Sequence, residues 1–330
     1  MPQDERSPTA DDLTDLARHG AALSVADRLT VLCCGDVEVL GRMPWSSNAT
    51  FLVVCRLGSD VVPAIYKPER GERPLWDFPT GIHRREVAAY ELSELLGLGI
   101  VPETVTRIDA PMGVGSLQRF VPANFSEHYF TVLEDPTKHD RLRALAAFDV
   151  VSNNADRKGG HVLLDVDGSI WAIDNGLSFH EEPKLRTVIW EFAGDPVPET
   201  LVEAIQALAN LPDPAGSEAD NEAASTGAID GSRSDPGSST GNRPGDRTGT
   251  GPASADRGAA SGGATAASDG ASETAGGTHR TPPSRRRSAL ADLLEPAEHR
   301  AMRRRARRLL AKGRLPHPDQ RYHQYPWPLV

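Results

Sequence analysis

The sequence predicts an α+β protein in which an antiparallel sheet is followed by helices, and two observations support this fold class. Short β-branched runs between residues 30 and 66 are separated by turn residues such as Gly58-Ser59-Asp60, and strands that follow one another so closely pair in antiparallel fashion. Apolar residues with helical spacing begin at Ile82 and recur in later segments. Residues 212–283, in contrast, contain a single large aliphatic residue, Ile229.

The predicted strands form one group before the first helix and another after it. They cover residues 30–34, 37–40, 50–55 and 61–66, and then 103–108 and 115–120. The residues before them, 1–20, are charged and small. They predict a frayed lead-in, in which Leu13 and Leu16 support no more than one helical turn.

Helices are predicted where apolar residues recur every three or four positions. The first begins near Ile82 and is ended by Gly97. Later helices are expected over 140–151, 198–208 and from Pro296 to Gly313, with one helical turn at 290–294 and a hairpin of strands 162–164 and 169–173. Within the last helix and the segment after it, we expect four residues to be buried: Leu309, Leu310, Trp327 and Leu329.

The segment 212–283 is predicted to be a disordered insert. Its residues cannot bury enough apolar surface to offset an ordering cost of about 1–2 kcal/mol per residue. The expected organisation is therefore a flexible tail (1–25), a sheet-containing part (26–120), a helical part (121–211), the insert (212–283), and C-terminal helices that complete the helical part (284–330).

Composition limits the classes of function. The net charge of -10 implies no general attraction to nucleic acid. The three cysteines show no zinc-ligand spacing, and no apolar run approaches the ~18 residues of a membrane span, so we expect a cytoplasmic protein. One basic feature is the final helix, which carries six arginines between residues 300 and 308. It is either a solvated outer face or a weak contact site for acidic lipid or a phosphorylated partner.

Two aspartates flank the predicted hairpin and suggest a catalytic centre. Asp156 precedes the hairpin and Asp174 follows it, 18 residues later, so both can face one cleft, with His161 between them in sequence. Two carboxylates and an imidazole suit metal-assisted phosphoryl transfer. The alternative is structural: turn residues for the aspartates and a buried core histidine.

Lys67 at the end of a predicted strand and Glu86 in the following helix are 19 residues apart. This spacing allows an ion pair between a strand and a helix packed on the sheet. A surface pair worth about 0–1 kcal/mol is the alternative.

Taken in order, several segments resemble the small bacterial members of the phosphatidylinositol 3-/4-kinase-like family, which share the bilobal protein-kinase-like fold. The resemblance covers roughly 28–211 and 284–330. It is carried by residues 39–48, Tyr66-Lys67-Pro68, 71–79, 85–90, 153–161, Ile173-Asp174-Asn175-Gly176, 184–187 and 325–330. It implies an antiparallel-sheet N-lobe and a mostly helical C-lobe.

The resemblance also implies roles for individual residues. Lys67 would bridge the α- and β-phosphates of ATP and pair with Glu86, while Asp156, followed by Arg157, would orient or deprotonate the attacking hydroxyl. Asp174 would hold Mg²⁺ or Mn²⁺. Phosphate would be covered by Ser46, Ser47 and Asn48, and the adenine would meet a hinge of residues 118–121 that includes Gln118, Phe120 and Val121.

Three departures from the family pattern stand at Lys158, His161 and Asn175. His161 replaces a metal-binding asparagine, and imidazole shifts preference toward Mn²⁺; Asn153 or Asn154 could supply an oxygen ligand instead. Asn175 stands where kinases often have phenylalanine.

The predicted function is transfer of the γ-phosphate of ATP to a hydroxyl of a protein or small molecule, with a lipid less favoured. Two alternatives stay open: a nucleotide-binding pseudokinase scaffold, and adenylyl transfer to a protein hydroxyl.

Overall fold

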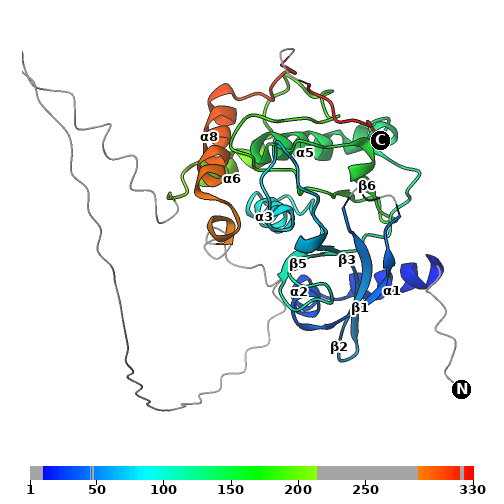
Figure 1. Cartoon of the computed structure of the whole chain (residues 1–330). Helices are drawn as coiled ribbons and strands as arrows, with labels where there is room; N and C mark the ends of the chain where they lie inside the picture. Colours follow the sequence, from blue (N-terminus) through cyan, green and yellow to red (C-terminus); the bar gives the residue numbers. More distant parts are fainter. Residues whose placement is uncertain (1–9, 45, 47, 214–288, 320–322) are drawn as a thin grey trace, which may run out of the picture. The chain divides into compact units, whose positions relative to one another are not determined.

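The computed structural model describes residues 10–44, 46, 48–213, 289–319 and 323–330. Within this part, five strands form one antiparallel sheet (Figure 1). They are β1 (Asp36–Arg42), β2 (Phe51–Leu57), β3 (Asp60–Pro68), β4 (Thr104–Arg107) and β5 (Gly115–Arg119), in the order β1-β2-β3-β5-β4. The predicted insert at 212–283 lies, from residue 214 onward, outside the described residues.

The predicted strand at 30–34 is wrong, because these residues end helix α2 (Val25–Cys34). The side chain of Ser24 accepts a hydrogen bond from the backbone N–H of Asp27 and thereby caps the first turn. The fully buried Leu32 then fixes the helix against the sheet. The β-branched residues of this run are tolerated in a helix whose apolar face is buried.

The frayed lead-in is also wrong for residues 10–22, which form helix α1 (Ala10–Ala22) packed on β3. Gly20 allows the close approach, since a Cβ atom there would meet the carbonyl oxygen of Val61 at 3.2 Å. Residues 1–9 of the predicted tail lie outside the described part.

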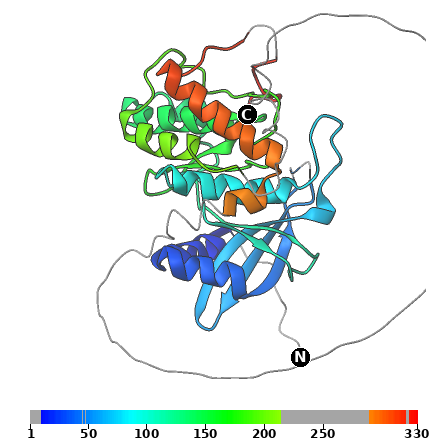
Figure 2. The same cartoon turned by 90° about the vertical axis from the view of Figure 1, so that its left-hand side faces the viewer.

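Helix α3 (Ile82–Leu95) connects the sheet to the helices that follow. It contacts β4 and β5 on one side and α5 (His139–Ser152) on the other, and Figure 2 shows it between these two layers. Ten of its residues are buried, including the charged Arg85 and Glu86. Helix α3 therefore connects the sheet to the helical part, and its buried charged residues lie between the two.

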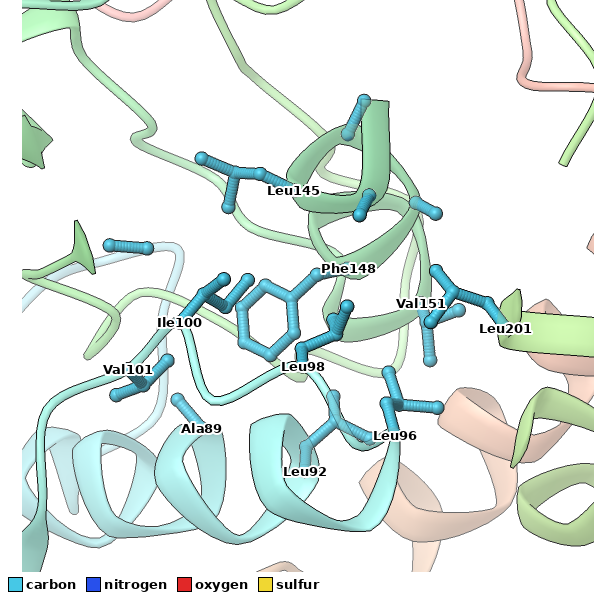
Figure 3. Close-up of a cluster of buried hydrophobic side chains, with 14 of the residues drawn as sticks. Ala89, Leu92, Leu96, Leu98, Ile100, Val101, Leu145, Phe148, Val151 and Leu201 are labelled. Carbon is cyan, nitrogen blue, oxygen red and sulfur yellow. The ribbon is translucent and has the colours of Figure 1, made fainter. Parts of the chain in front are cut away.

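The helical part contains α4 (Tyr129–Val132), α5, α6 (Glu199–Ala209) and α8 (Pro296–Lys312), together with the hairpin of β6 (Val162–Leu164) and β7 (Ile170–Ala172). Single turns of 3-10 helix cover Glu69–Gly71, Pro136–Lys138 and Gly159–His161. Phe148 of α5 is fully buried, and Figure 3 shows its ring beside Leu98 and Ile100. The predicted helices at 82–96, 140–151, 198–208 and 296–313 are confirmed.

Helix α8 is less uniformly solvated than its composition predicts. Arg304, Arg307 and Arg308 are exposed, but Arg303 is buried, and Arg305 donates to the carbonyl oxygens of Val151 and His180. The helix is thus bound to the core through part of its basic face. None of the helices in the described part combines the length and apolar character that crossing a membrane requires.

The prediction that four C-terminal apolar residues are buried is correct only in part. Leu309 is buried and Leu310 packs against the core, but Trp327 is 87% exposed and Leu329 is 40% exposed. Residues 323–330 are extended without regular structure and hold to the molecule partly through backbone groups: the carbonyl oxygens of Gln324 and Leu329 accept hydrogen bonds from Thr187 and Gly159. Backbone hydrogen bonds and the buried Pro326, and not Trp327 or Leu329, therefore hold this segment in place.

The architecture is α+β, with the order of elements that the resemblance to the protein-kinase-like fold leads us to expect. An antiparallel sheet with one helix inserted between β3 and β4 forms the N-lobe, and a mostly helical C-lobe follows.

Candidate functional site

Lys67 joins two carboxylates from different elements. Its Nζ atom, near the end of β3, donates to Oε1 of Glu86 on α3 and, at 2.8 Å, to Oδ1 of Asp174 after β7. Burial lowers the pKa of Lys67, but the carboxylates of Asp174 and Glu86 outweigh it and hold this pKa above its usual value. The ammonium group is therefore charged at neutral pH and ties sheet, helix and hairpin together.

Asp174 also faces His161. The Nε2 atom of His161 lies 3.3 Å from Oδ2 of Asp174, while Lys67 holds the other oxygen. The charge of Lys67 lowers the pKa of Asp174 well below its usual range, and burial lowers the pKa of His161 to about 4. At neutral pH the pair is thus a carboxylate beside a neutral imidazole.

This donor set fits a divalent metal ion that also binds phosphate. Among the described residues, no group of three or more His, Cys, Asp or Glu side chains is arranged to hold a metal ion by itself. A Mg²⁺ site usually consists of one or two carboxylates, and water and substrate phosphates complete the coordination. Asp174 can provide the carboxylate. The backbone N–H of Lys158 lies 3.5 Å from Nδ1 of His161. If Nε2 bound a metal ion, the proton of the neutral ring would lie on Nδ1, and Nδ1 could no longer accept this long contact.

Asp156 lies on the loop between α5 and β6. Asn153 ends α5 in a left-handed conformation (φ 58°), and the side-chain oxygen of Asn154 accepts the backbone N–H of Asp156 at 2.9 Å. Lys158 Nζ lies 3.1 Å from Asp156 Oδ2. Burial raises the pKa of Asp156, and the Lys158 ammonium opposes this rise. The Asn153 side chain bonds to the backbone of Glu182 and Lys184, and neither Asn153 nor Asn154 lines the cavity, so neither is placed there as a metal ligand.

Arg157 does not reach the cavity. It is fully buried, pairs with Asp149 at 3.0 Å and donates to the carbonyl oxygen of Ile173 at 2.8 Å. Its Nη2 atom also donates to the side chain of Asn175. The geometry makes Arg157 a positioning residue, which links the loop of Asp156 to the loop of Asp174, and not a residue that touches the substrate.

Asn175 and Gly176 attach α3 to this network. The fully buried Asn175 donates its backbone N–H to Oε2 of Glu86 at 3.1 Å, and a Cβ atom on Gly176 would collide with Ile82 at the start of α3. Where kinases often place an apolar phenylalanine, this chain uses a hydrogen-bonded amide. The position of Glu86 is therefore fixed from the hairpin as well as from Lys67.

Lys67, Glu86, His161 and Asp174 line one cavity that is open to solvent. Its walls come from the segment before β2, from β3, from α3 and from the loops on either side of the hairpin. They include Ser46, Asn48, Thr50, Lys67, Glu72, Ile82, His83, Glu86, Lys158, His161 and Asp174. The cavity thus brings Lys67, Glu86, His161 and Asp174 together, whereas Asp156, which we expect at the same cleft, is not among the lining residues and is connected to them through its partner Lys158.

Two of the predicted phosphate-covering residues, Ser46 and Asn48, lie in the same wall. The hydroxyl groups of Ser46 and Thr50 are 2.7 Å apart, and the side-chain oxygen of Asn48 accepts the backbone N–H of Arg73 at 3.0 Å. Ser47 lies outside the described residues.

The predicted adenine hinge is not brought into this cavity. Gln118 and Val121 are buried, and the Gln118 side chain donates to Thr104. The backbone N–H of Phe120 donates to the carbonyl oxygen of Pro63 at 2.9 Å, so it is not free to bind a base. Of the backbone groups in the predicted hinge, the N–H of Phe120 is therefore already used in pairing with β3.

Sequence reasoning missed two cavity residues, Glu72 and His83. The glutamate accepts the imidazole Nδ1 at 2.7 Å and the backbone N–H groups of Gly81 and His83 at the start of α3. The segment 71–79 contributes to the family resemblance, but nothing in its residue types assigns Glu72 to a cavity wall. Its partner His83, eleven positions further along, lies in the first turn of a helix and reads there as an ordinary helical residue.

Comparisons with solved structures give only weak global similarity. The matches include hydra Fam20 with sugar (15% identity, 51% of this chain and 72% of that chain, TM-score 0.34) and the Helicobacter pylori proinflammatory kinase CtkA (12%, 53% and 80%, TM-score 0.33). A third is the Golgi casein kinase with Mn/ADP bound (12%, 98% and 81%, TM-score 0.43). At these scores the likeness carries no argument about function, and the fold assignment depends on the chain's own sheet order and helix placement.

Sequence comparison gives a closer relationship. No protein-family model matches the chain. Protein Rv2133c of Mycobacterium tuberculosis (strain ATCC 25618 / H37Rv) is 41% identical over 226 residues, which are 58% of this chain and 81% of that protein. Identity at this level over most of the relative's length establishes common descent. The chain therefore belongs to the same family as protein Rv2133c.

Proposed function

We propose that this protein is a metal-dependent phosphotransferase of the phosphatidylinositol 3-/4-kinase-like type. It would transfer the γ-phosphate of ATP to a hydroxyl group of a protein or a small molecule, with a lipid as the less favoured acceptor. The observation that carries the proposal is the placement of Lys67, which contacts both Glu86 and Asp174 beside one open cavity.

The charged groups of the cavity suit a bound triphosphate. Lys67 would contact phosphate oxygens while Glu86 keeps its ammonium group in place. Asp174, with His161 beside it, would hold a divalent ion, which would supply positive charge to the phosphates during transfer. The backbone and hydroxyl groups around Ser46 would cover the phosphates from the sheet side.

Asp156 is the residue that we propose to orient and deprotonate the acceptor hydroxyl. Its carboxylate is only partly exposed, and burial raises its pKa, which makes it a better proton acceptor than a solvated aspartate. Lys158, paired with it at 3.1 Å, would hold this carboxylate in place between proton transfers.

The test compares ATP consumption by wild type and by Asp156→Asn, with Mg²⁺ and with Mn²⁺. We expect the substitution to lower the rate by roughly 10²–10⁴-fold, the usual contribution of a positioned general base. Asp167→Asn is the matched control, because Asp167 is an exposed aspartate in the turn of the β6–β7 hairpin. Equal rates for wild type and Asp156→Asn would exclude Asp156 from catalysis. The mass gain of a modified acceptor then separates a phosphate from an adenylyl adduct.

A further inference from the structure

The pair formed by Glu72 and His83 lies in the cavity wall without a role in the proposed reaction. Glu72 belongs to the irregular segment between β3 and α3, and His83 lies in the first turn of α3. Both contribute to the cavity that contains Lys67 and Asp174. His83 is 4% exposed, so its ring is held in one place by its surroundings.

One hydrogen bond to Glu72 orients the His83 ring, and two backbone hydrogen bonds hold the Glu72 side chain in place. Oε1 of Glu72 accepts Nδ1 of His83 at 2.7 Å and the backbone N–H of His83 at 2.8 Å, and Oε2 accepts the backbone N–H of Gly81 at 3.0 Å. Because a carboxylate only accepts hydrogen bonds, Nδ1 carries a proton. Nδ1 is then engaged, and Nε2 is the ring nitrogen that can serve a ligand in the cavity.

The charge balance of the cavity indicates what this nitrogen would meet. The lining carboxylates of Glu72, Glu86 and Asp174 outnumber the ammonium groups of Lys67 and Lys158. Both ammonium groups are already paired, Lys67 with Glu86 and Asp174, and Lys158 with Asp156. Besides the divalent ion proposed at Asp174, a bound triphosphate would gain from a further donor, and the His83 ring, held by Glu72 in the cavity wall, is placed to supply a hydrogen bond to an ionised phosphate oxygen.

We propose that His83, oriented by Glu72, is an additional nucleotide-binding residue that donates from Nε2 to a phosphate oxygen. The inference rests on the proposed function, because it assumes that the cavity holds a nucleoside triphosphate. A purely structural role is the competing explanation, since Glu72 also caps α3 by accepting two of its first N–H groups. The cap uses backbone donors only, so the two roles can be separated by substituting the imidazole.

The experiment measures the affinity of the full chain for ATP and for adenosine by calorimetry, in the presence of Mg²⁺. His83→Phe keeps an aromatic ring but removes the donor, and we expect it to weaken ATP binding about tenfold or more while adenosine binding stays unchanged. His83→Gln can still donate and should recover part of the loss. His317→Gln, which changes an exposed histidine after α8, is the control.

The outcomes separate the inference from the proposed function. Wild-type protein that binds no ATP with either metal would contradict the function itself. Wild-type binding that His83→Phe leaves unchanged would overturn the role of His83, and an equal loss for ATP and adenosine would assign it to structure. If His83→Phe fails to fold, as judged by its thermal melting curve, Glu72→Gln replaces it, because this change leaves an acceptor for the helix cap and removes the charge. ATP affinity equal to wild type in Glu72→Gln would then overturn the proposal.

Discussion

Replacement of Arg157 by leucine is expected to lower the free energy of unfolding by about 3–5 kcal/mol, the usual cost of leaving one member of a buried ion pair without its partner. Arg157 and Asp149 are both fully buried, and their side chains meet at 3.0 Å. The substitution would also remove the donors to Ile173 and Asn175. Because most domains are stable by only about 5–15 kcal/mol, this is a large fraction of the total.

The measurement is thermal or denaturant unfolding of purified variants. A loss of this size corresponds to a drop of roughly 6–20 °C in melting temperature for a domain of this length. Arg18→Leu is the control, since Arg18 forms an exposed ion pair with Asp15 that should contribute about 0–1 kcal/mol. The double variant Arg157→Leu/Asp149→Leu should be more stable than the single one, because no charge is then left buried alone. A single variant that melts like Arg18→Leu would contradict the network.

The sequence predicts much of this fold because most elements carry periodic apolar residues or strong end signals. Gly97 marks the end of α3, and the hairpin turn at Asp167-Gly168 marks β6 and β7. The strand predicted at 30–34 fails because β-branched residues favour strands only weakly, and burial of Leu32 in α2 overrides that preference.

The candidate site is predictable to a different degree. Lys67, Glu86 and Asp174 lie at element ends or in a helix whose packing follows from its apolar face, so their convergence can be anticipated. The burial of Arg157 cannot, because arginine is nearly always exposed and only its partners reveal the exception. The contact between Glu72 and His83 crosses an irregular segment, where no periodicity relates one residue to another.

The exposed Trp327 shows a third kind of limit. A large aromatic residue near the end of a chain predicts burial from hydrophobicity alone, yet the residues around it are held partly through backbone groups of Gln324 and Leu329. Backbone hydrogen bonds do not depend on the identity of the side chain, so they cannot be predicted from the composition of this segment. Position within the fold, and not residue type, decides the exposure here.

Replacement of Asp174 by asparagine is expected to abolish the contribution of metal to nucleotide binding and to lower ATP turnover by at least about 100-fold, the scale for losing one preorganised electrostatic group. The charge of Lys67 holds the pKa of Asp174 well below its usual range, so wild type carries a full negative charge there at neutral pH. Asparagine keeps the shape of this side chain but removes the anion that a divalent ion requires. Lys67 would keep its contact with Glu86, which should limit the structural effect.

Nucleotide affinity is measured for both proteins with excess Mg²⁺, with Mn²⁺, and after metal removal by EDTA. Wild type should bind ATP more tightly with either metal than without, whereas Asp174→Asn should show one affinity under all three conditions. Asp167→Asn, the exposed control, should behave like wild type. A metal-dependent gain in Asp174→Asn equal to that of wild type would place the ion elsewhere. The contact between Lys67 and Asp174 would then be a structural ion pair, and the assignment of this cavity to phosphoryl transfer would lose its main support.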